Sequence, residues 1–427
     1  MEKIYPDFTV ETLGECAIPS PVTDVPFIED GHVLYYAHIG KIRECLDAGF
    51  EPPQMEIAGP RAKIFFQPSE LRCGIVTCGG ICPGINDVIR SIVLCLRYHY
   101  GVERVFGFRF GYEGLVPKYG HEPLSLTPES VKGIHQIGGS ILASSRGSQD
   151  VGEMVDTLER MKVGILFTIG GDGTLRGSQA IAEEAKRRGA KIAVIGIPKT
   201  IDNDISYVEE TFGFETAVTE TRTSLYSAHV EATGARNGVG LVKLMGRQSG
   251  FIAAYATLAN SEVNFCLVPE VPFTLEGFMK ALEERLSKKG HALVVVAEGA
   301  GQDLMEGTGA CDASGNVRLG DIGIFLRGSI REHFRKKGVE MNLKYIDPSY
   351  TIRSTPANAR DSAFCLLLGQ YAVHAGMTGR TGMIVGVWRG EFTHVPILMA
   401  ISRRKQVNPE GWLWAAVLSS TGQSKSM

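Results

Sequence analysis

The stretch that decides the fold, residues 165–205, reads ILFTIGGDGTLRGSQAIAEEAKRRGAKIAVIGIPKTIDNDI. The apolar run at residues 163–169 suits a buried strand, and the glycines that follow predict a sharp turn with bared backbone N–H groups at a helix start. A helix from Thr174 to Gly189 and a second apolar strand at residues 191–197 complete a βαβ unit. Such a unit predicts a right-handed crossover within a mostly parallel sheet.

Both polar loops of this unit follow the end of a predicted strand. The first contains GGDGT (residues 170–174), and the second contains PKTIDND (residues 198–204). Ligands of open α/β sheets bind outside the carboxyl ends of the strands. We therefore expect a phosphate cradle and a group of carboxylates to face one crevice.

Composition indicates an ordinary globular enzyme with room for two domains. Of the 427 residues, 44% are hydrophobic and 21% are charged, and the net charge of −3 gives no general attraction to nucleic acid or anionic membranes. No apolar run approaches the ~20 residues of a membrane span, and the N-terminus lacks the features of a secretory signal. The nine cysteines form no recognisable disulfide framework. We expect a cytoplasmic protein that binds neither nucleic acid nor membrane.

Charged residues recur at one kind of position along the chain. Strands are predicted at residues 163–169, 191–197, 239–245 and 292–297, and a charged residue comes just past the end of each. These four residues are Asp172, Asp202, Arg247 and Glu298. Four such residues in one α/β pattern favour a shared site over four solvated loops.

The string GGDGT predicts a phosphate site with a metal. Its glycines let backbone N–H groups approach phosphate, and Asp172 offers one carboxylate to Mg²⁺. A plain glycine turn, with Asp172 stabilising the helix dipole, is the structural alternative. Lipid kinases and kinases of nicotinamide dinucleotides use a similar string, so GGDGT alone does not name a substrate.

The string TIDND predicts phosphoryl transfer to a hydroxyl. One of its two carboxylates, Asp202 or Asp204, can accept the hydroxyl proton, while the other orients the hydroxyl or binds a metal through water. Lys199 adds a cation where phosphate charge develops. A loop capped by its own Asp and Asn side chains is the alternative, and it leaves Lys199 unexplained.

Two earlier loops have the composition of phosphate-binding loops. A glycine loop at residues 79–84 lies between a predicted strand and a helix for which Asn86 is a candidate N-cap. A run of small residues at 138–147 carries Arg146, which can hold phosphate bidentately or remain a solvated loop arginine.

Taken with GGDGT, MGR (residues 245–247), AEG (residues 297–299) and YIDPSYTIRS (residues 345–354), the string PKTIDND resembles the 6-phosphofructokinases. The long ATP-dependent branch of plants, kinetoplastids and some bacteria is the most similar. The resemblance runs from about Leu71 to the C-terminal region. It implies an α/β fold of two similar doubly wound, Rossmann-like domains with mostly parallel sheets behind an N-terminal extension.

The domains implied are an extension at residues 1–71, a nucleotide-binding domain at 72–212 with 353–402, and a sugar-phosphate-binding domain at 213–352 with 403–427 and its C-terminal tail. The resemblance places the nucleotide against Gly79, Tyr112, Arg146, Gly147, Gly171, Asp172, Gly173 and Thr174, with Mg²⁺ on Asp172. It makes Asp202 the base, with Lys199 and Arg247 as catalytic cations. It places the sugar phosphate against Thr200, Ile201, Asp202, Asp204, Met245, Gly246, Arg247, Glu298, Lys344, Tyr350 and Arg353.

The sequence departs from the short bacterial enzymes of this family at several positions. Those enzymes have histidine where Tyr350 stands and aspartate where Ile81 stands. They also borrow an arginine from a neighbouring subunit, and the matching position here falls near Gly238, with Arg236 close by. We expect a homodimer or homotetramer with shared active sites.

The expected reaction is transfer of the γ-phosphoryl group of ATP to the 1-hydroxyl of fructose 6-phosphate. A pyrophosphate-dependent enzyme with the same acceptor is the nearest alternative. In this family a glycine at position 173 accompanies ATP use, whereas Lys199 occurs with either donor. A lipid or dinucleotide kinase conflicts with PKTIDND, and a non-catalytic sensor conflicts with the presence of both Asp172 and Asp202.

Overall fold

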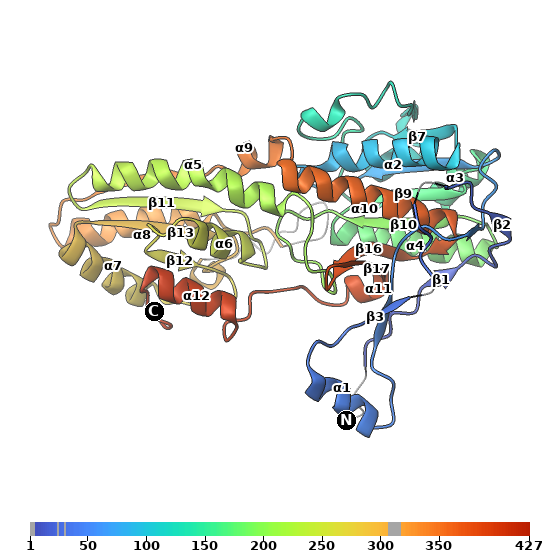
Figure 1. The fold of residues 1–427 in the computed structure, drawn as a ribbon. Helices are drawn as coiled ribbons and strands as arrows, with labels where there is room; N and C mark the ends of the chain where they lie inside the picture. Colours follow the sequence, from blue (N-terminus) through green and yellow to red (C-terminus); the bar gives the residue numbers. More distant parts are fainter. Residues whose placement is uncertain (1–4, 24, 30, 306–316) are drawn as a thin grey trace. The chain divides into compact units, whose positions relative to one another are not determined.

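The computed structural model describes residues 5–23, 25–29, 31–305 and 317–427, which form two compact units (Figure 1). The first unit comprises Met1–Thr200, Ile205–Phe212 and Pro356–Arg403, and the second comprises Ile201–Asp204, Gly213–Thr355 and Arg404–Met427. This division differs from the expected boundaries at four places. It groups the loop Ile201–Asp204 and residues 353–355 with the second unit, groups Arg403 with the first, and does not separate residues 1–71 from the first.

The first unit is built on a seven-stranded sheet in the order β17-β16-β10-β9-β6-β7-β8. The five inner strands are parallel, and β17 and β8 pair antiparallel at the edges. In chain order the strands are β6 (Arg72–Thr77), β7 (Arg104–Phe108), β8 (Leu124–Ser125), β9 (Ile165–Gly170), β10 (Ala193–Pro198), β16 (Met383–Trp388) and β17 (Glu391–Pro396). Every residue of β9 and β10 is buried, which explains their continuous apolar sequences.

Helices pack on this sheet in pairs. Helix α2 contacts α10, and α3 contacts α4, while α4 and α10 both contact β10. The helices of the unit are α2 (Ile85–Tyr100), α3 (Val151–Arg160), α4 (Asp172–Arg188), α10 (Ala359–Met377) and the short α11 (Ile397–Ala400), with 3-10 turns at η1 (Gly111–Leu115), η2 (Pro117–Tyr119) and η3 (Ile134–Gln136). A buried apolar cluster joins α3 and α4 to the strands beneath them. The expected α/β fold with a mostly parallel sheet is confirmed.

The expected N-cap role of Asn86 is wrong. Helix α2 begins at Ile85 after Gly84, whose φ of +96° favours glycine. The side chain of Asn86 instead donates to the carbonyl oxygen of Ile137 at 2.8 Å and accepts from the amide of Ile141 at 2.9 Å. Asn86 therefore holds the loop that leads to Arg146.

The N-terminal residues form short strands and one helix attached to the first unit. Strand β1 (Glu11–Thr12) pairs with β15 (Arg380–Thr381), β2 (Ile18–Pro19) pairs with β5 (Lys63–Ile64), and β3 (His32–Leu34) pairs with β4 (Gln54–Glu56). Helix α1 (Ile39–Asp47) follows β3. In Figure 1, β3 and α1 are drawn in blue below the sheet of the first unit.

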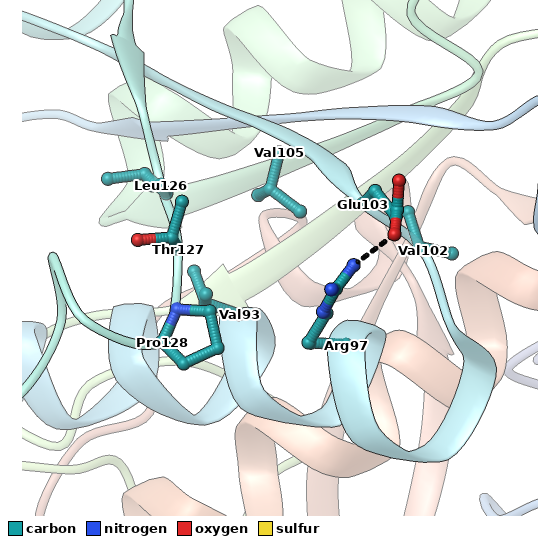
Figure 2. Close-up of a pocket in the computed structure, with 8 residues that line it drawn as sticks. All are labelled: Val93, Arg97, Val102, Glu103, Val105, Leu126, Thr127 and Pro128. Atoms are coloured by element: carbon teal, nitrogen blue, oxygen red, sulfur yellow. Dashed lines mark hydrogen bonds and ion pairs between the residues drawn. The ribbon is translucent and has the colours of Figure 1, made fainter.

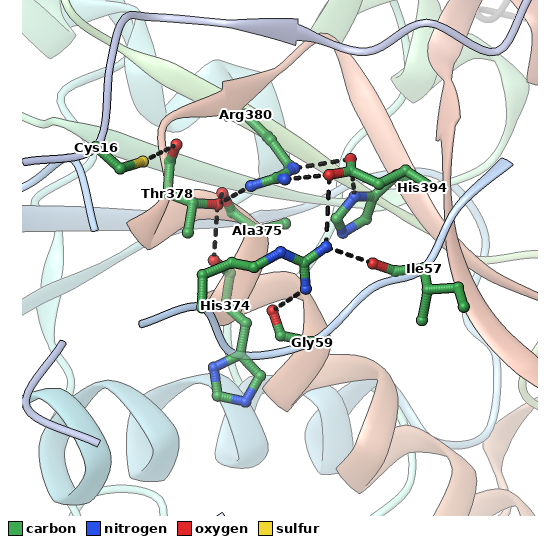
Figure 3. Close-up of polar contacts among 10 residues, drawn as sticks. Cys16, Ile57, Gly59, His374, Ala375, Thr378, Arg380 and His394 are labelled. Atoms are coloured by element: carbon green, nitrogen blue, oxygen red, sulfur yellow. Dashed lines mark hydrogen bonds and ion pairs between the residues drawn. The ribbon is translucent and has the colours of Figure 1, made fainter. Parts of the chain in front are cut away.

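A charged cluster joins this segment to the final strands of the first unit (Figure 3). Glu56 at the end of β4 accepts from Nε of Arg380 at 2.8 Å and lies 2.7 Å from Nδ1 of His394. Arg61 reaches the same carboxylate at 3.4 Å and donates to the carbonyl oxygen of Ile57 at 2.7 Å. Because Arg61 and Arg380 are almost fully buried, the Glu56 carboxylate is needed to compensate their positive charge.

The second unit is built on four parallel strands in the order β12-β13-β11-β14. They are β11 (Gly238–Leu244), β12 (Phe265–Leu267), β13 (His291–Ala297) and β14 (Asn342–Ile346). The helices are α5 (Phe214–Thr233), α6 (Phe251–Ala259), α7 (Leu275–Lys289), α8 (Ile322–Lys336), α9 (Ser349–Ser354) and α12 (Trp412–Thr421), with a 3-10 turn at η4 (Gln302–Leu304). An apolar cluster from α7, α8 and all four strands forms the core. Among the described residues, no helix is both long and apolar enough to span a membrane.

Candidate active site

Three loops of the first unit converge on Lys199. Its backbone amide donates to the carbonyl oxygen of Gly170 at 2.9 Å, and its Nζ donates to that of Gly80 at 2.6 Å. A Cβ added at Gly79 would lie 3.3 Å from Nζ, and φ at Gly79 is +86°. Glycine therefore suits position 79, where a left-handed backbone lies beside the lysine. The structure brings the loops after β6, β9 and β10 together, with the side chain of Lys199 buried among them.

The loop at residues 138–147 lies against the same glycines. The Ser144 hydroxyl donates to the carbonyl oxygen of Gly79 at 2.6 Å, and the Gly79 amide donates to that of Ser145 at 3.0 Å. A Cβ at Gly80 would lie 3.6 Å from Nη2 of Arg146. The exposed Arg146 thus lies beside the glycines, and Gly147, with φ of +105°, turns the chain directly after it.

The GGDGT loop ends in the first turn of α4. Gly171 is the N-cap, and Asp172 forms an ion pair of 3.1 Å with Arg176 one turn later. Gly173 is exposed, and a Cβ there would meet no atom within 4 Å. The described residues contain no cluster of three or more side chains that would hold a metal alone. A single accessible carboxylate fits Mg²⁺, which takes most of its ligands from phosphate and water.

Tyr112 occupies a different place from the one that a nucleotide contact requires. Its ring is buried in the cluster beneath α3 and α4, and its hydroxyl donates to the carbonyl oxygen of Thr174 at 2.6 Å. The hydroxyl also lies 3.0 Å from Oγ of Ser178. Tyr112 therefore supports the first turn of α4, which carries Asp172 and Gly173, rather than lining an open surface.

Asp202 is the half-buried carboxylate at the centre of the second unit's charged residues. Its Oδ2 accepts from the backbone amide of Arg247 at 3.3 Å. Burial of the carboxyl group is the largest cause that raises the pKa of Asp202, to about 7, and the negative charges of Asp204 and Glu298 add to it. The Arg247 amide and the positive charge of Arg353 oppose this shift. A carboxyl group with this pKa can accept a proton near neutral pH.

The strings MGR and AEG lie side by side because β11 and β13 end together. Leu244 pairs with Ala297, the Glu298 amide donates to the carbonyl oxygen of Leu244 at 2.9 Å, and the Gly299 amide donates to that of Gly246 at 3.0 Å. A Cβ at Gly299 would lie 1.9 Å from the backbone oxygen of Arg247, so only glycine fits. Met245 and Gly246 are buried, and the Arg247 side chain donates to the carbonyl oxygen of Val317.

The residues expected to bind the remote phosphate lie in two different settings. Arg353 and Tyr350 are on α9, where Arg353 is half-buried and influences Asp202, while Tyr350 is 83% exposed. Lys344 pairs in the sheet opposite Gly240, four residues before the end of β11, and its Nζ lies 3.4 Å from Glu231 on α5. Lys344 therefore lies apart from the strand ends that carry Arg247 and Glu298.

The loop that carries Asp202 has neighbours that sequence reasoning did not assign to the site. Thr200 accepts through its carbonyl oxygen from Thr211 at 2.7 Å, and Ile201 is buried. Asp204 forms an ion pair of 2.9 Å with Arg404, in the C-terminal part of the second unit. The one available signal was the basic run at residues 403–405, which lies about 200 residues away in the sequence.

A pocket of about 280 Å³ in the first unit is lined by a different set of residues (Figure 2). Val93, Val105 and Leu126 give it an apolar floor, and Arg97 forms an ion pair of 2.8 Å with Glu103 at its side. None of the residues expected to bind nucleotide or sugar lines it, so the pocket is not part of the candidate active site.

Comparisons with known proteins agree on one family. A model of the family described as Phosphofructokinase matches residues 72–376. The chain is 48% identical to the ATP-dependent 6-phosphofructokinase of Borreliella burgdorferi, over 99% of the chain and 98% of that protein. It is 50% identical to the ATP-dependent 6-phosphofructokinase of the kinetoplastid Trypanosoma cruzi, over 88% of the chain and 78% of that protein.

A solved structure is similar in fold. The pyrophosphate-dependent phosphofructokinase of Marinobacter aquaeolei matches with a TM-score of 0.69 and 19% identity, over 82% of this chain and 91% of that one. At this identity the likeness concerns the fold alone and does not bear on the phosphoryl donor.

Proposed function

Because this chain belongs to the phosphofructokinase family, we propose that it transfers the γ-phosphoryl group of ATP to the 1-hydroxyl of D-fructose 6-phosphate, giving fructose 1,6-bisphosphate and ADP. The observation that carries this proposal is Asp202, a half-buried carboxyl group whose pKa is raised to about 7. Relatives named as ATP-dependent enzymes, one of them matched over nearly the full length of both chains, support ATP over pyrophosphate as donor.

Asp202 acts as the general base. The sugar 1-hydroxyl transfers its proton to the carboxylate as its oxygen attacks the γ-phosphorus. The bond from the γ-phosphorus to the bridging oxygen of ADP breaks, and ADP leaves with that electron pair. The raised pKa suits this role, because a carboxylate with a pKa of 3.8 would be a much weaker base.

The glycine loops around Lys199 hold the donor. The backbone of Gly79 and Gly171 leaves room for phosphate, and Lys199 with Arg146 supplies positive charge to the phosphate oxygens. The fixed position of Lys199 matters because a preorganised cation stabilises charge in the transition state without reorganising. Thr174 and Gly147 shape the two loops that carry these groups.

Asp172 would hold Mg²⁺ together with the phosphate oxygens. The ion supplies neutralisation of phosphate charge when bound. The Arg176 ion pair keeps the Asp172 carboxylate directed along the first turn of α4, where an anion also interacts favourably with the helix dipole.

The second unit binds the sugar phosphate. Arg247 and Arg353 supply positive charge for the substrate, and Glu298 supplies an acceptor for sugar hydroxyls. Met245, Gly246, Ile201 and Asp204, all within the second unit, shape the surrounding wall. Tyr350 contributes to phosphate binding from the exposed side of α9. Lys344 contributes less, because it lies apart from the strand ends that carry Arg247 and Glu298.

The test is a coupled assay that follows fructose 1,6-bisphosphate with ATP or pyrophosphate as donor. We expect turnover with ATP, fructose 6-phosphate and Mg²⁺, and little with pyrophosphate. A preference for pyrophosphate would overturn the donor assignment, and absence of product with either donor would overturn the activity.

The proposed cytoplasmic location is supported by the eight described cysteines, which are all present as thiols. The homodimer or homotetramer stays a prediction.

A further inference from the structure

We propose that the C-terminal segment Arg404–Val407 is a positioning element of the catalytic loop, with Arg404 and Lys405 as a basic clamp on Asn203 and Asp204. This inference rests on the proposed function, because it assigns the base to Asp202. All the residues involved lie within the second unit.

The clamp makes three contacts with the loop. Nη1 of Arg404 donates to Oδ2 of Asp204 at 2.9 Å, and the amide of Lys405 donates to the backbone oxygen of Asp204 at 2.9 Å. Nζ of Lys405 donates to Oδ1 of Asn203 at 2.8 Å. Asn203 and Asp204 are both buried, and Asn203 has φ of +55°, a left-handed conformation that asparagine adopts more readily than most residues.

Hydrogen bonds to Glu270 and to residues 248–250 hold the clamp in place. Oε1 of Glu270 accepts from the amides of Val407 and Gly250, both at 2.8 Å. The buried Ser249 donates to the carbonyl oxygen of Lys405, and Gln406 donates to that of Gln248 at 2.9 Å. The segment is therefore anchored to residues 248–250, which directly follow Arg247.

These contacts connect two sides of Asp202. Arg247 donates its amide to Asp202 from one side, and the clamp holds the two residues that follow Asp202 in the chain. Displacement of the clamp would therefore free Asp202 on both sides. It would release Asn203 and Asp204, and it would loosen residues 248–250, which directly follow Arg247. We class Arg404 as a positioning residue, because it reaches the base only through Asp204.

The clamp also affects the charge around the base. The groups that act on the Asp202 carboxyl are Asp204 on its own loop, Glu298 after β13, the Arg247 amide after β11 and Arg353 on α9. Arg404 offsets the negative charge of Asp204. Its loss should therefore leave more uncompensated negative charge beside Asp202 and make its deprotonation harder.

The experiment compares Arg404→Met with Arg404→Lys and with Arg403→Met in the full-length chain. Arg403 is the matched control, because it is exposed and its guanidinium lies 5.0 Å from the Tyr207 ring rather than on the loop. We expect Arg404→Met to lose at least tenfold in kcat with little change in the KM for ATP. We also expect the acid limb of its kcat/KM profile to shift to higher pH. Arg404→Lys should recover most of kcat, and Arg403→Met should match wild type.

A double-mutant cycle tests the route through Asp204. If Arg404 acts through that carboxylate, Arg404→Met should have much less effect in the Asp204→Asn background than in wild type. Full additivity, or wild-type kcat and pH midpoint in Arg404→Met, would overturn the proposal.

Hydrogen exchange separates this proposal from the proposed function. The amides of residues 201–204 should exchange faster in Arg404→Met than in Arg403→Met, whatever reaction the protein catalyses. Equal exchange in the two variants would exclude the clamp. Faster exchange in a protein that fails the ATP assay would exclude the function and retain the clamp. If Arg404→Met fails to fold, Lys405→Met carries the kinetic and exchange comparisons, because it removes the side-chain contact with Asn203 while the backbone contact with Asp204 remains. It also removes the approach of Nζ to the Phe251 ring at 5.4 Å, so Phe251→Leu is its control.

Discussion

Nζ of Lys243 lies 2.9 Å from Oδ2 of Asp347, so an ion pair joins the end of β11 to the segment that begins α9. The other oxygen of Asp347 accepts from the amide of Ser349 at 3.1 Å and from its hydroxyl at 2.6 Å. Lys243 also lies 2.9 Å from Asp321, which caps α8. One lysine therefore fixes the start of both helices, including the one that carries Arg353.

Replacing Lys243 by Met should weaken binding of the sugar phosphate. The change leaves two carboxylates without their shared cation, which should cost about 1–2 kcal/mol of stability because both stay partly hydrated. We expect the KM for fructose 6-phosphate to rise more than the KM for ATP. Lys243→Arg should recover part of the loss, and Lys288→Met, at an exposed position, should have no effect. Equal rises in both KM values would count against a specific role in positioning α9.

The activity should have an acid limb set by Asp202. Because only the deprotonated carboxyl group accepts a proton, and its pKa is raised to about 7, kcat/KM should rise with pH and level off above about pH 7. Asp202→Asn should lower kcat by roughly 10²–10⁴-fold or more, the usual contribution of a general base. The exposed Asp303→Asn serves as control. Retention of more than about a tenth of wild-type kcat would remove Asp202 from this role.

Arg353→Ala should reduce the specificity for fructose 6-phosphate by about 2–4 kcal/mol, the scale for truncating one partner of a buried charge pair. The effect should appear in kcat as well as KM, because binding energy from a remote phosphate also serves the reacting centre. Fructose without its phosphate should be hardly affected, and the exposed Arg331→Ala should resemble wild type. Equal proportional losses for both sugars would indicate that Arg353 supports structure instead.

Gly173→Asp should abolish most ATP use without disturbing the fold. A side chain at this exposed position meets no atom within 4 Å, so the variant should be as stable as wild type. The new carboxylate would oppose nucleotide phosphate charge by roughly 4 kcal/mol at ~4 Å and an effective dielectric of ~20. Even half of this energy exceeds the ~1.4 kcal/mol that corresponds to a tenfold change. We therefore expect the specificity for ATP to fall by about two orders of magnitude. Gly173→Asn, of equal size without charge, should retain far more activity, and equal losses in both variants would make size the cause.

Glu56→Gln should destabilise the first unit by about 3–5 kcal/mol, because it leaves two buried arginines without their carboxylate. Although burial opposes ionisation, hydrogen bonds from Arg380 and His394 hold the pKa of Glu56 well below its usual range. The contribution of Glu56 is therefore complete above its unfolded pKa, near 4.5, and is lost as the pH falls through the folded value. Urea unfolding at pH 7 and pH 3 measures both effects. The difference between wild type and variant should shrink at pH 3, and the exposed Glu51→Gln should be neutral.

The long apolar elements were predictable because burial determines their composition. Strands β9 and β10 and helix α4 appear within a few residues of their expected bounds. The segment at residues 344–353 is polar and has no regular apolar pattern, yet Lys344 belongs to β14 and Arg353 to α9. Strand β14 has two exposed residues among five, so its sequence is weakly periodic, and its pairing with β11 is a tertiary effect.

Site residues within one loop were easier to anticipate than those that depend on side-chain direction. The convergence of Gly79 and Lys199 follows from β6 and β10, two parallel strands that end at one edge of the sheet. The buried position of Tyr112 and the pairing of Lys344 with Glu231 depend on packing that no local pattern encodes. Arg404 was missed for the same reason, since its partner Asp204 is 200 residues away.

The order of strands in the first unit has a consequence for synthesis of the chain on the ribosome. Strand β10, buried along its whole length, pairs on one side with β16, which begins about 185 residues after β10 ends. At a synthesis rate of about 5–20 residues per second, roughly 10–40 s pass between the synthesis of β10 and that of β16. The nascent chain therefore carries an open apolar sheet edge, the usual template for aggregation, throughout that interval. Any product truncated before Met383 would keep that edge open permanently.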